Sequence, residues 1–274
     1  MTGGEVGSVE TLKVERRDGV VTVVLSRSEK KNAGNPTMWR ELAETFTEIE
    51  RTPGDRVMVV TGAGGDFCSG ADLEGISGDA LDYMKRASHA AEALSALTIP
   101  TIAKVDGVAV GAGWNLALGC DLVVATDRAR FSQIFIRRAL SLDFGGSWLL
   151  PRLVGLQKAK ELAYFGEILS AAEASEMGLV TRIVAVDELD TVVESMARRL
   201  VHAPAQALSL TKQLLDAAAD GGSVEAALQR ENHAQAINML GPDAVEARAA
   251  FVEKREAVYY RADSASAPAP VQES

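Results

Sequence analysis

Apolar and polar residues alternate along residues 9–27, on both sides of Asp18 and Gly19. Alternation of this kind is typical of half-buried strands, and Asp-Gly is a hairpin signal. From Pro36 the apolar positions recur at helical spacing to residue 52. Strands are then predicted at 56–61 and 101–105, with a helix between them that runs from Tyr83 into 91–99. This strand, strand, helix order predicts a layered α/β body, although no internal sequence repeat accompanies it.

The composition changes at Asp187, where alanine- and leucine-rich stretches replace the β-branched clusters. Helices are predicted at 187–202, 206–219, 223–240 and 242–257. The two ends of the chain are small, polar or proline-rich, which is typical of disorder. We therefore divide the chain into a disordered N-terminus (1–8), an α/β core (9–186), a helical C-terminal region (187–261) and a disordered tail (262–274).

Composition narrows the function only by exclusion. The 274 residues are 47% apolar and carry a net charge of −10, which argues against a nucleic-acid surface because phosphate binding needs clustered cations. The sequence has no apolar run of transmembrane length, and its first residues lack the basic and apolar regions of a secretory signal. The two cysteines, Cys68 and Cys120, are expected to be reduced and buried as packing residues. A cytoplasmic protein is the simplest expectation.

Two glycine-rich segments carry the candidate chemistry. Residues 102–126 pass from a β-branched run through Gly107, Gly111 and Gly113 into a helix-compatible segment. Residues 57–73 repeat the strand and glycine-loop order. Such loops aim free backbone N–H groups at one point, where a developing negative charge can be held. Two donors from two loops would make an oxyanion hole.

Six segments together resemble the enoyl-CoA hydratase/isomerase family, also called the crotonase family, over about residues 10–260. They are LSRSEKKNAGN (25–35), DFCSGADL (66–73), GVAVGAGWNLALGCDLVVAT (107–126), FGGSWLLPRLVG (144–155), AAEASEMGLVTRIV (171–184) and AFVEKR (250–255). The resemblance implies a crotonase-like spiral of strand-strand-helix repeats, followed by a C-terminal helical trimerisation region. It also implies a homotrimer or homohexamer that acts on acyl-CoA thioesters.

The same resemblance places the oxyanion hole on the backbone N–H groups of Ala71 and Ala112. The alternative is that both loops are tight turns whose glycines only meet a need for positive φ. The resemblance further implies substrate or CoA contacts at Lys31, Ala33, Gly70, Asp72, Leu73, Gly111 and Lys254. As exposed lysines, Lys31 and Lys254 are equally compatible with no special role.

The chain departs from the family's hydratases at both of their catalytic glutamates. Alignment of GAGWNLALGCD puts Asn115 at the first position, and alignment of RFSQIFIRRALSLDFGG puts Phe135 at the second. Asn does not titrate near neutral pH and Phe has no polar atom, so neither can be a general base. A two-glutamate hydration is therefore not expected.

One carboxyl group remains at a position that several family members use. Asp143 follows Phe135 by eight residues, and Leu142 stands where a proline is more usual before it. In family isomerases an aspartate here moves protons, and in an aryl-CoA dehalogenase it attacks the substrate; the motifs are most similar to the isomerases of bacterial phenylacetate degradation. The alternative is a helix N-cap before Gly145. Burial in an apolar pocket would raise the pKa of Asp143.

The remaining candidates concern the acyl pocket. Trp114, Asn115, Phe135 and Trp148 are expected to line or support it, with plain core packing an equal alternative for the aromatic residues. No metal site is indicated, and no cofactor is expected, because coenzyme A belongs to the substrate.

The sequence thus predicts an acyl-CoA enzyme that shifts a double bond in an enoyl-CoA through an enolate, with Asp143 as its one base. The alternatives are an enoyl-CoA hydratase, an acyl-CoA hydrolase and a non-catalytic acyl-CoA binding protein. The acyl chain and the pathway are not specified by the sequence.

Overall fold

A computed structural model describes residues 6–75 and 79–260. The chain divides into two compact units, Met1–Ala197 and Arg198–Ser274, and each is described here by itself. The predicted disorder of residues 1–5 and of the tail 262–274 lies outside the described residues. Disorder is wrong for residues 6–8, which form the edge strand β1 and pair with residues 13–15. Strand pairing uses main-chain groups, so it needs no apolar signal in the sequence.

The first unit contains a seven-stranded sheet. Asp18 and Gly19 both have positive φ, 50° and 80°, and join two antiparallel strands as the predicted hairpin. From the second hairpin strand onward, neighbouring strands are parallel to one another. Each parallel pair is joined by a long crossover connection, as parallel pairing requires. In spatial order the strands are β1 (Val6–Ser8), β2 (Leu12–Arg17), β3 (Val20–Leu25), β4 (Val57–Gly62), β5 (Thr101–Val105), β7 (Leu122–Thr126) and β10 (Arg182–Val184).

A smaller sheet lies beyond the carboxyl ends of β4 and β5. It consists of β6 (Val108–Val110), β8 (Arg130–Ser132) and β9 (Leu169–Ser170). The chain passes from β5 to β6 through Gly107, where a Cβ would lie 2.3 Å from the carbonyl oxygen of Gly65. This close approach of two backbones requires glycine and brings both glycine-rich loops to the same place.

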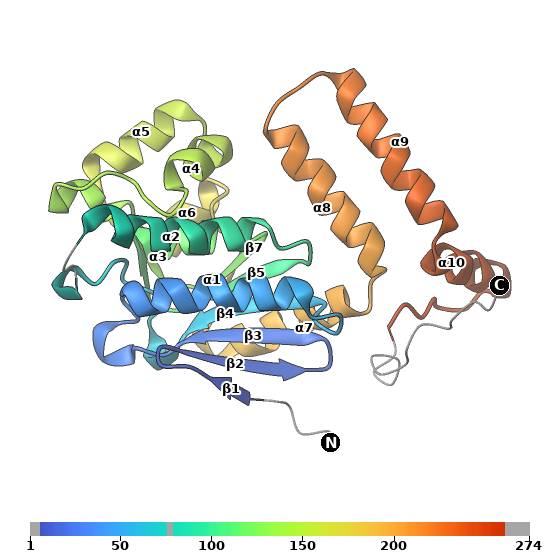
Figure 1. Ribbon diagram of the computed structural model, residues 1–274, viewed down its shortest axis with the longest axis horizontal. Coiled ribbons are helices and arrows are strands. Elements are labelled where there is room, and N and C mark those ends of the chain that lie inside the picture. Colours follow the sequence, from blue (N-terminus) through green and yellow to red (C-terminus); the bar gives the residue numbers. More distant parts are fainter. Residues whose placement is uncertain (1–5, 76–78, 261–274) are drawn as a thin grey trace. The chain divides into compact units, whose positions relative to one another are not determined.

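Two long helices, α1 (Pro36–Arg51) and α2 (Ala80–Ser95), lie side by side (Figure 1). Helix α1 begins as predicted, with the Asn35 side chain accepting a hydrogen bond from Met38 N. The helix predicted from Tyr83 into 91–99 is α2. It begins three residues earlier, at Ala80, where Asp79 accepts from Leu81 N, and it ends at Ser95, before the end of the predicted range.

The other helices of this unit are short. The α-helices are α3 (Ala112–Leu118), α4 (Gly146–Val154), α5 (Leu156–Phe165), α6 (Ala171–Glu176) and α7 (Leu189–Val201), the last of which extends past Ala197. The 3-10 helices are η1 (Ser28–Lys30), η2 (Ala63–Gly65), η3 (Leu73–Gly75), η4 (Ile134–Arg138) and η5 (Val186–Glu188).

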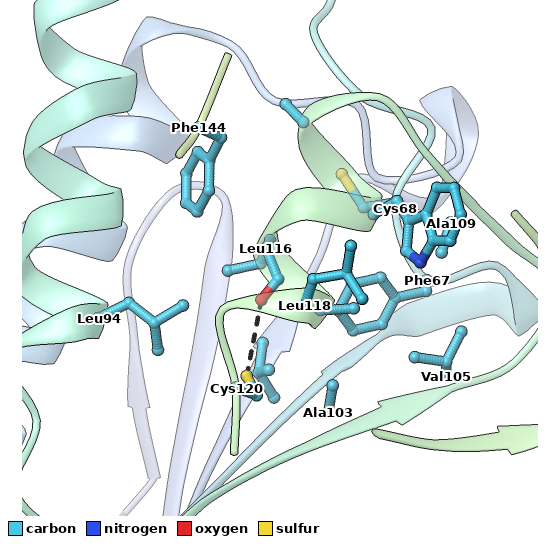
Figure 2. Close-up of a cluster of buried hydrophobic side chains, with 14 of the residues drawn as sticks. Phe67, Cys68, Leu94, Ala103, Val105, Ala109, Leu116, Leu118, Cys120 and Phe144 are labelled. Atoms are coloured by element: carbon cyan, nitrogen blue, oxygen red, sulfur yellow. Dashed lines mark hydrogen bonds between the residues drawn. The ribbon is translucent and has the colours of Figure 1, made fainter. Parts of the chain in front are cut away.

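The core of the first unit surrounds α3, whose seven residues are all buried. Figure 2 shows Leu116 and Leu118 of α3 among side chains from α2 and β5. Cys68 and Cys120 are buried in the same core, as predicted, and the Cys120 thiol lies 3.6 Å from the carbonyl oxygen of Leu116. Because α3 is packed on every side, the loop at its start is held rigidly.

The second unit is helical, as predicted for the C-terminal region. Its helices are α8 (Ala205–Ala219), α9 (Val224–Leu240) and α10 (Pro242–Glu253). Figure 1 shows α8 and α9 as an antiparallel pair. Within the described part of the chain, no helix is both long enough and apolar enough to cross a membrane.

Candidate active site

The two glycine-rich loops meet at Gly70 and Ala112. Val110 N donates to the carbonyl oxygen of Cys68 over 3.0 Å, which joins the first loop to β6. A Cβ at Gly70, where φ is 91°, would lie 3.0 Å from the carbonyl oxygen of Val110 and 3.7 Å from Ala112 N. The loops therefore lie in direct backbone contact, as the expected two-donor arrangement requires.

The N–H groups of Ala71 and Ala112 are available for a ligand. Gly34 pairs with the loop on either side of Ala71, donating to Gly70 O and accepting from Asp72 N, both over 2.8 Å. This pairing leaves Ala71 N pointing away from residue 34. Ala112 is the first residue of α3, so its N–H has no partner within the helix. Among the described residues, neither N–H donates a hydrogen bond to another part of the chain.

Asp143 lies in the turn between η4 and α4. The residue is half-buried, and its Oδ1 atom is inaccessible to solvent and has no hydrogen-bond partner among the described residues. Burial raises the pKa of this carboxyl from 3.8 to about 7. A carboxyl group with such a pKa changes protonation state near neutral pH, where it can act as either base or acid.

The alternative of Asp143 as a helix N-cap is wrong. Helix α4 begins after Gly145, which is the N-cap residue with φ of 77°, and no side chain caps it. Only the backbone of Asp143 takes part in the turn, since its carbonyl oxygen accepts from Gly146 N over 2.9 Å. The turn also contains Phe144, which has a left-handed backbone with φ of 47°.

Cys68 and Tyr83 lie close enough to Asp143 to respond to its charge. Burial raises the pKa of the Cys68 thiol to about 12, and the Asp143 carboxylate adds to that rise. The pKa of Tyr83 is also raised, first by burial and in part by Asp143. The Tyr83 hydroxyl donates to Gly34 O over 3.1 Å and accepts from Trp39 Nε1 over 3.2 Å. Both groups are neutral at the pH where Asp143 titrates.

Asn115 and Phe135 occupy the two positions where the resemblance places the glutamates of hydratases. Asn115 is fully buried, and its amide nitrogen donates to the carbonyl oxygen of Asp143 over 2.8 Å. Its side-chain oxygen accepts from Gln133 Nε2, also over 2.8 Å. Phe135 is 6% exposed, and its ring would lie 3.6 Å from a Cβ at Gly111. Phe135 therefore packs against the second loop, where φ of Gly111 is 56°.

The two candidate tryptophans differ in burial. Trp114 is fully buried, with its ring centroid 5.5 Å from that of Phe131, so its contacts are those of the core. Trp148 is 43% exposed on α4, and the Arg152 guanidinium lies 3.9 Å from its ring centroid. This places Trp148 on the surface of the unit.

Arg27 donates hydrogen bonds to two of the candidate CoA-contact residues. Its guanidinium donates to the carbonyl oxygen of Ala33 and, over 2.8 Å, to the carboxylate of Asp72. The Arg27 hydrogen bond lowers the pKa of Asp72. Leu73 follows at the start of η3 and is 45% exposed. Arg27, which the sequence did not single out, thus fixes the loop that carries Ala71.

The candidate lysines are both exposed. Lys31, with φ of 50°, lies 3.3 Å from Asp66 through its Nζ. Lys254 ends α10 with φ of 54° and belongs to the second unit. Searched over residues 6–75 and 79–260, the structure has no cluster of three His, Cys, Asp or Glu side chains that could hold a metal ion.

Gln133, Tyr83 and Trp39 contribute to the geometry but were not predicted as site residues. Gln133 is 1% exposed and interrupts the apolar run around Phe131 and Phe135, so a polar residue within an apolar run was the available signal. Tyr83 and Trp39 lie on α2 and α1, and their approach to the site depends on how these helices pack.

The family model described as "Enoyl-CoA hydratase/isomerase" matches residues 15–262. The 1,2-epoxyphenylacetyl-CoA isomerase of Escherichia coli is 35% identical over 245 residues, which cover 86% of this chain and 93% of that protein. The crotonyl-CoA hydratase of Syntrophomonas wolfei is 30% identical over 256 residues, which cover 90% and 97%.

The fold agrees with these matches. The crystal structure of an enoyl-CoA hydratase from Mycobacterium smegmatis superposes with a TM-score of 0.86 at 34% identity, and the match covers 92% of this chain and 99% of that one. The predicted α/β crotonase fold with a helical C-terminal region is therefore confirmed. The chain belongs to the enoyl-CoA hydratase/isomerase, or crotonase, family, and it is an enzyme of that family, which acts on acyl-CoA thioesters.

Proposed function

We propose that this enzyme is an enoyl-CoA isomerase that converts a 3-enoyl-CoA to the 2-enoyl-CoA with Asp143 as its only acid-base group. The proposal rests on the burial of the Asp143 carboxyl and on its raised pKa. Its Oδ1 is buried and without a partner in the described structure, and burial raises its pKa to about 7. Such a carboxyl is a stronger base than an exposed one.

In the first step, the Asp143 carboxylate removes a proton from C2 of the substrate. The electron pair of that C–H bond moves toward the thioester, and the negative charge gathers on the thioester oxygen. The N–H groups of Ala71 and Ala112 donate to that oxygen. Because both groups are fixed by their loops before the reaction, no reorganisation is needed as the charge forms.

In the second step, protonated Asp143 returns the proton at C4. The electrons of the C3–C4 double bond form this new C–H bond, the C1–C2 electrons of the enolate move to make the C2–C3 double bond, and the oxygen lone pair re-forms the thioester carbonyl. The proton that was removed is the proton that returns, so no water and no cofactor is consumed. We include Phe135 as a pocket wall, and we propose that Gly70 and Gly111 shape the loops while Ala33, Asp72 and Leu73 contact the CoA moiety.

Hydration of an enoyl-CoA is the second candidate, because the Syntrophomonas relative is named a crotonyl-CoA hydratase. The residues at positions 115 and 135 weigh against it. Asn115 uses its amide within the protein and Phe135 has no polar atom, so neither can activate water. We also propose that the C-terminal helices assemble a homotrimer or homohexamer, as the family resemblance implies.

The test is product analysis by mass spectrometry with 3-enoyl-CoA and 2-enoyl-CoA substrates in heavy water. Isomerisation by one shuttling group gives a product of unchanged mass, or of one added deuterium where the carboxyl exchanges with solvent. Hydration gives a mass increase from the added water. Formation of hydrated product alone from both substrates would overturn the isomerase proposal.

A further inference from the structure

The backbone turn that carries Asp143 has two consecutive left-handed residues. Phe144 has φ of 47° and Gly145 has φ of 77°. This region suits glycine but is disfavoured for a residue with a Cβ, and above all for a bulky one. Such a conformation persists only where neighbouring groups hold it.

Two contacts hold this turn. The Phe144 side chain is 3% exposed, and its ring centroid lies 5.4 Å from that of Trp39 on α1. Asn115 supplies the second contact, the 2.8 Å hydrogen bond from its amide nitrogen to Asp143 O. Asn115 also packs directly against the turn, since a Cβ at Gly146 would lie 2.3 Å from Asn115 Nδ2.

The chemistry of the partners fixes the orientation of both buried amides. A backbone carbonyl can only accept, so Asn115 must present its NH₂ group to Asp143 O. Its oxygen then faces Gln133, which must present its own NH₂ group. The Gln133 oxygen is left buried and without a partner among the described residues. The order of donors therefore runs in one direction, from Gln133 through Asn115 to the turn.

We propose that Asn115 and Gln133 are positioning residues whose two amides form a relay that holds the Asp143 turn and aims its carboxyl at the reacting carbons. This inference rests on the proposed function for its kinetic consequence. The Asn115 amide holds the backbone of the residue that carries the carboxyl. Asn115 therefore acts through Asp143 and does not itself touch the reacting atoms.

The relay is tested with Asn115→Leu, Gln133→Met and the double variant. Both replacements keep side-chain size and remove the amide donors. Thr101→Val is the matched control, because Thr101 is also fully buried and its hydroxyl exchanges hydrogen bonds of 2.8 and 2.9 Å with Asp121. Thr101 begins β5, at the end opposite to the loop at Gly107. The control loses buried hydrogen bonds without touching the turn.

Two measurements need no activity. Hydrogen exchange followed by mass spectrometry should show faster exchange of the peptide 143–150 in the Asn115→Leu and Gln133→Met variants, because Gly146 N donates to the carbonyl that Asn115 holds. Carboxyl NMR should show the pKa of Asp143 falling from about 7 toward its ordinary value, as the released turn admits water. The neighbouring titratable groups, Cys68 and Tyr83, stay neutral in this range. Thr101→Val should change neither result.

Kinetics then tests the link to catalysis. We expect Asn115→Leu to lower kcat for 3-enoyl-CoA isomerisation about 10- to 100-fold, since a small misplacement of a catalytic group has effects of this order. KM should change less than about threefold, because the oxyanion donors are untouched. Gln133→Met should lower kcat less, and the double variant should lose no more than Asn115→Leu alone, which is the non-additivity of a relay.

Wild-type exchange at 143–150 and an unchanged pKa of Asp143 in Gln133→Met would overturn the relay, even if Asn115→Leu failed to fold. Fully additive losses of kcat in the double variant would do the same. Absence of isomerase activity in the wild type would instead overturn the proposed function, while the exchange and titration results would still decide whether the relay holds the turn.

Discussion

Replacement of Asp143 by Asn should make the protein more stable and less active at once. Ionisation of the Asp143 carboxyl costs free energy in the folded protein, because burial raises its pKa from 3.8 to about 7. The difference is about three powers of ten in proton affinity, and at about 1.4 kcal/mol for each it amounts to at most about 4 kcal/mol. This is the free energy that the folded wild type loses when Asp143 is ionised.

The sign of the effect follows from the direction of the pKa change. Below about pH 4 the carboxyl is protonated in both the folded and the unfolded chain, so it contributes no pH dependence. Between about pH 4 and pH 7 the unfolded chain releases the proton first, and the stability of the wild type falls relative to the variant. Above about pH 7 the difference is constant, since both states are ionised. Asn does not titrate in this range.

The assay is urea unfolding of both proteins at several pH values from 4 to 8, together with isomerisation of a 3-enoyl-CoA. We expect the variant's advantage to grow with pH, and kcat to fall at least about a hundredfold, or roughly 2.7 kcal/mol in the barrier. Glu44→Gln on the exposed face of α1 is the control, because its carboxylate pairs with the i−4 residue Arg40 at the surface. It should retain the wild-type activity.

A stability difference that does not vary with pH would refute the burial argument. Wild-type activity in Asp143→Asn would refute its role as the base, whatever the stability result. A large loss of acyl-CoA affinity in the variant would also count against the reasoning, because the proposed oxyanion donors, Ala71 and Ala112, lie on other loops.

Four further predictions follow from the same structure. The kcat/KM of isomerisation should rise with pH through about 7, because the free enzyme must hold Asp143 as the base; a flat profile would contradict this. Crotonyl-CoA hydration should be roughly 10²- to 10⁴-fold slower than in a two-glutamate hydratase, by direct rate comparison. Gly113→Ala should lower Tm or prevent folding, because a Cβ there would lie 2.3 Å from Cys68 O. Phe46→Ala, in the core, should lower the unfolding free energy by about 3–5 kcal/mol in urea.

Local signals predicted the elements that local chemistry determines. Asp18 and Gly19 form a hairpin because both adopt positive φ, and Asn35 with Pro36 begins α1 because one caps and the other fits the first turn. The end of α2 was predicted less well, because the helix ends at Ser95 while Leu97 and Ile99 continue to pack against the core beyond it. An apolar pattern alone does not mark the last hydrogen-bonded residue of a helix.

The sequence predicted the two glycine-rich loops of the site, but it left the role of Asp143 open between a base and a helix cap. The glycines of both loops reveal where backbones approach closely, and the structure brings Ala71 and Ala112 to neighbouring places. Whether Asp143 capped a helix depended on where α4 begins, and it begins after a turn in which the left-handed Phe144 packs its ring against Trp39 of α1. Such a contact arises from tertiary packing, and no pattern around residue 143 encodes it.

The arrangement explains how one carboxyl can serve a reaction that takes and gives the same proton. A group with pKa far below 7 would be a weak base, and one far above would rarely be ionised. With a pKa of about 7, Asp143 is present in both forms near neutral pH, so removal at C2 and return at C4 are both accessible. A second titrating group at position 115 would add a charge beside the turn, whereas the Asn115 amide holds the turn without one. The burial of Asp143 and the proposed neutral relay therefore both support the proposal of proton transfer by one base rather than addition of water.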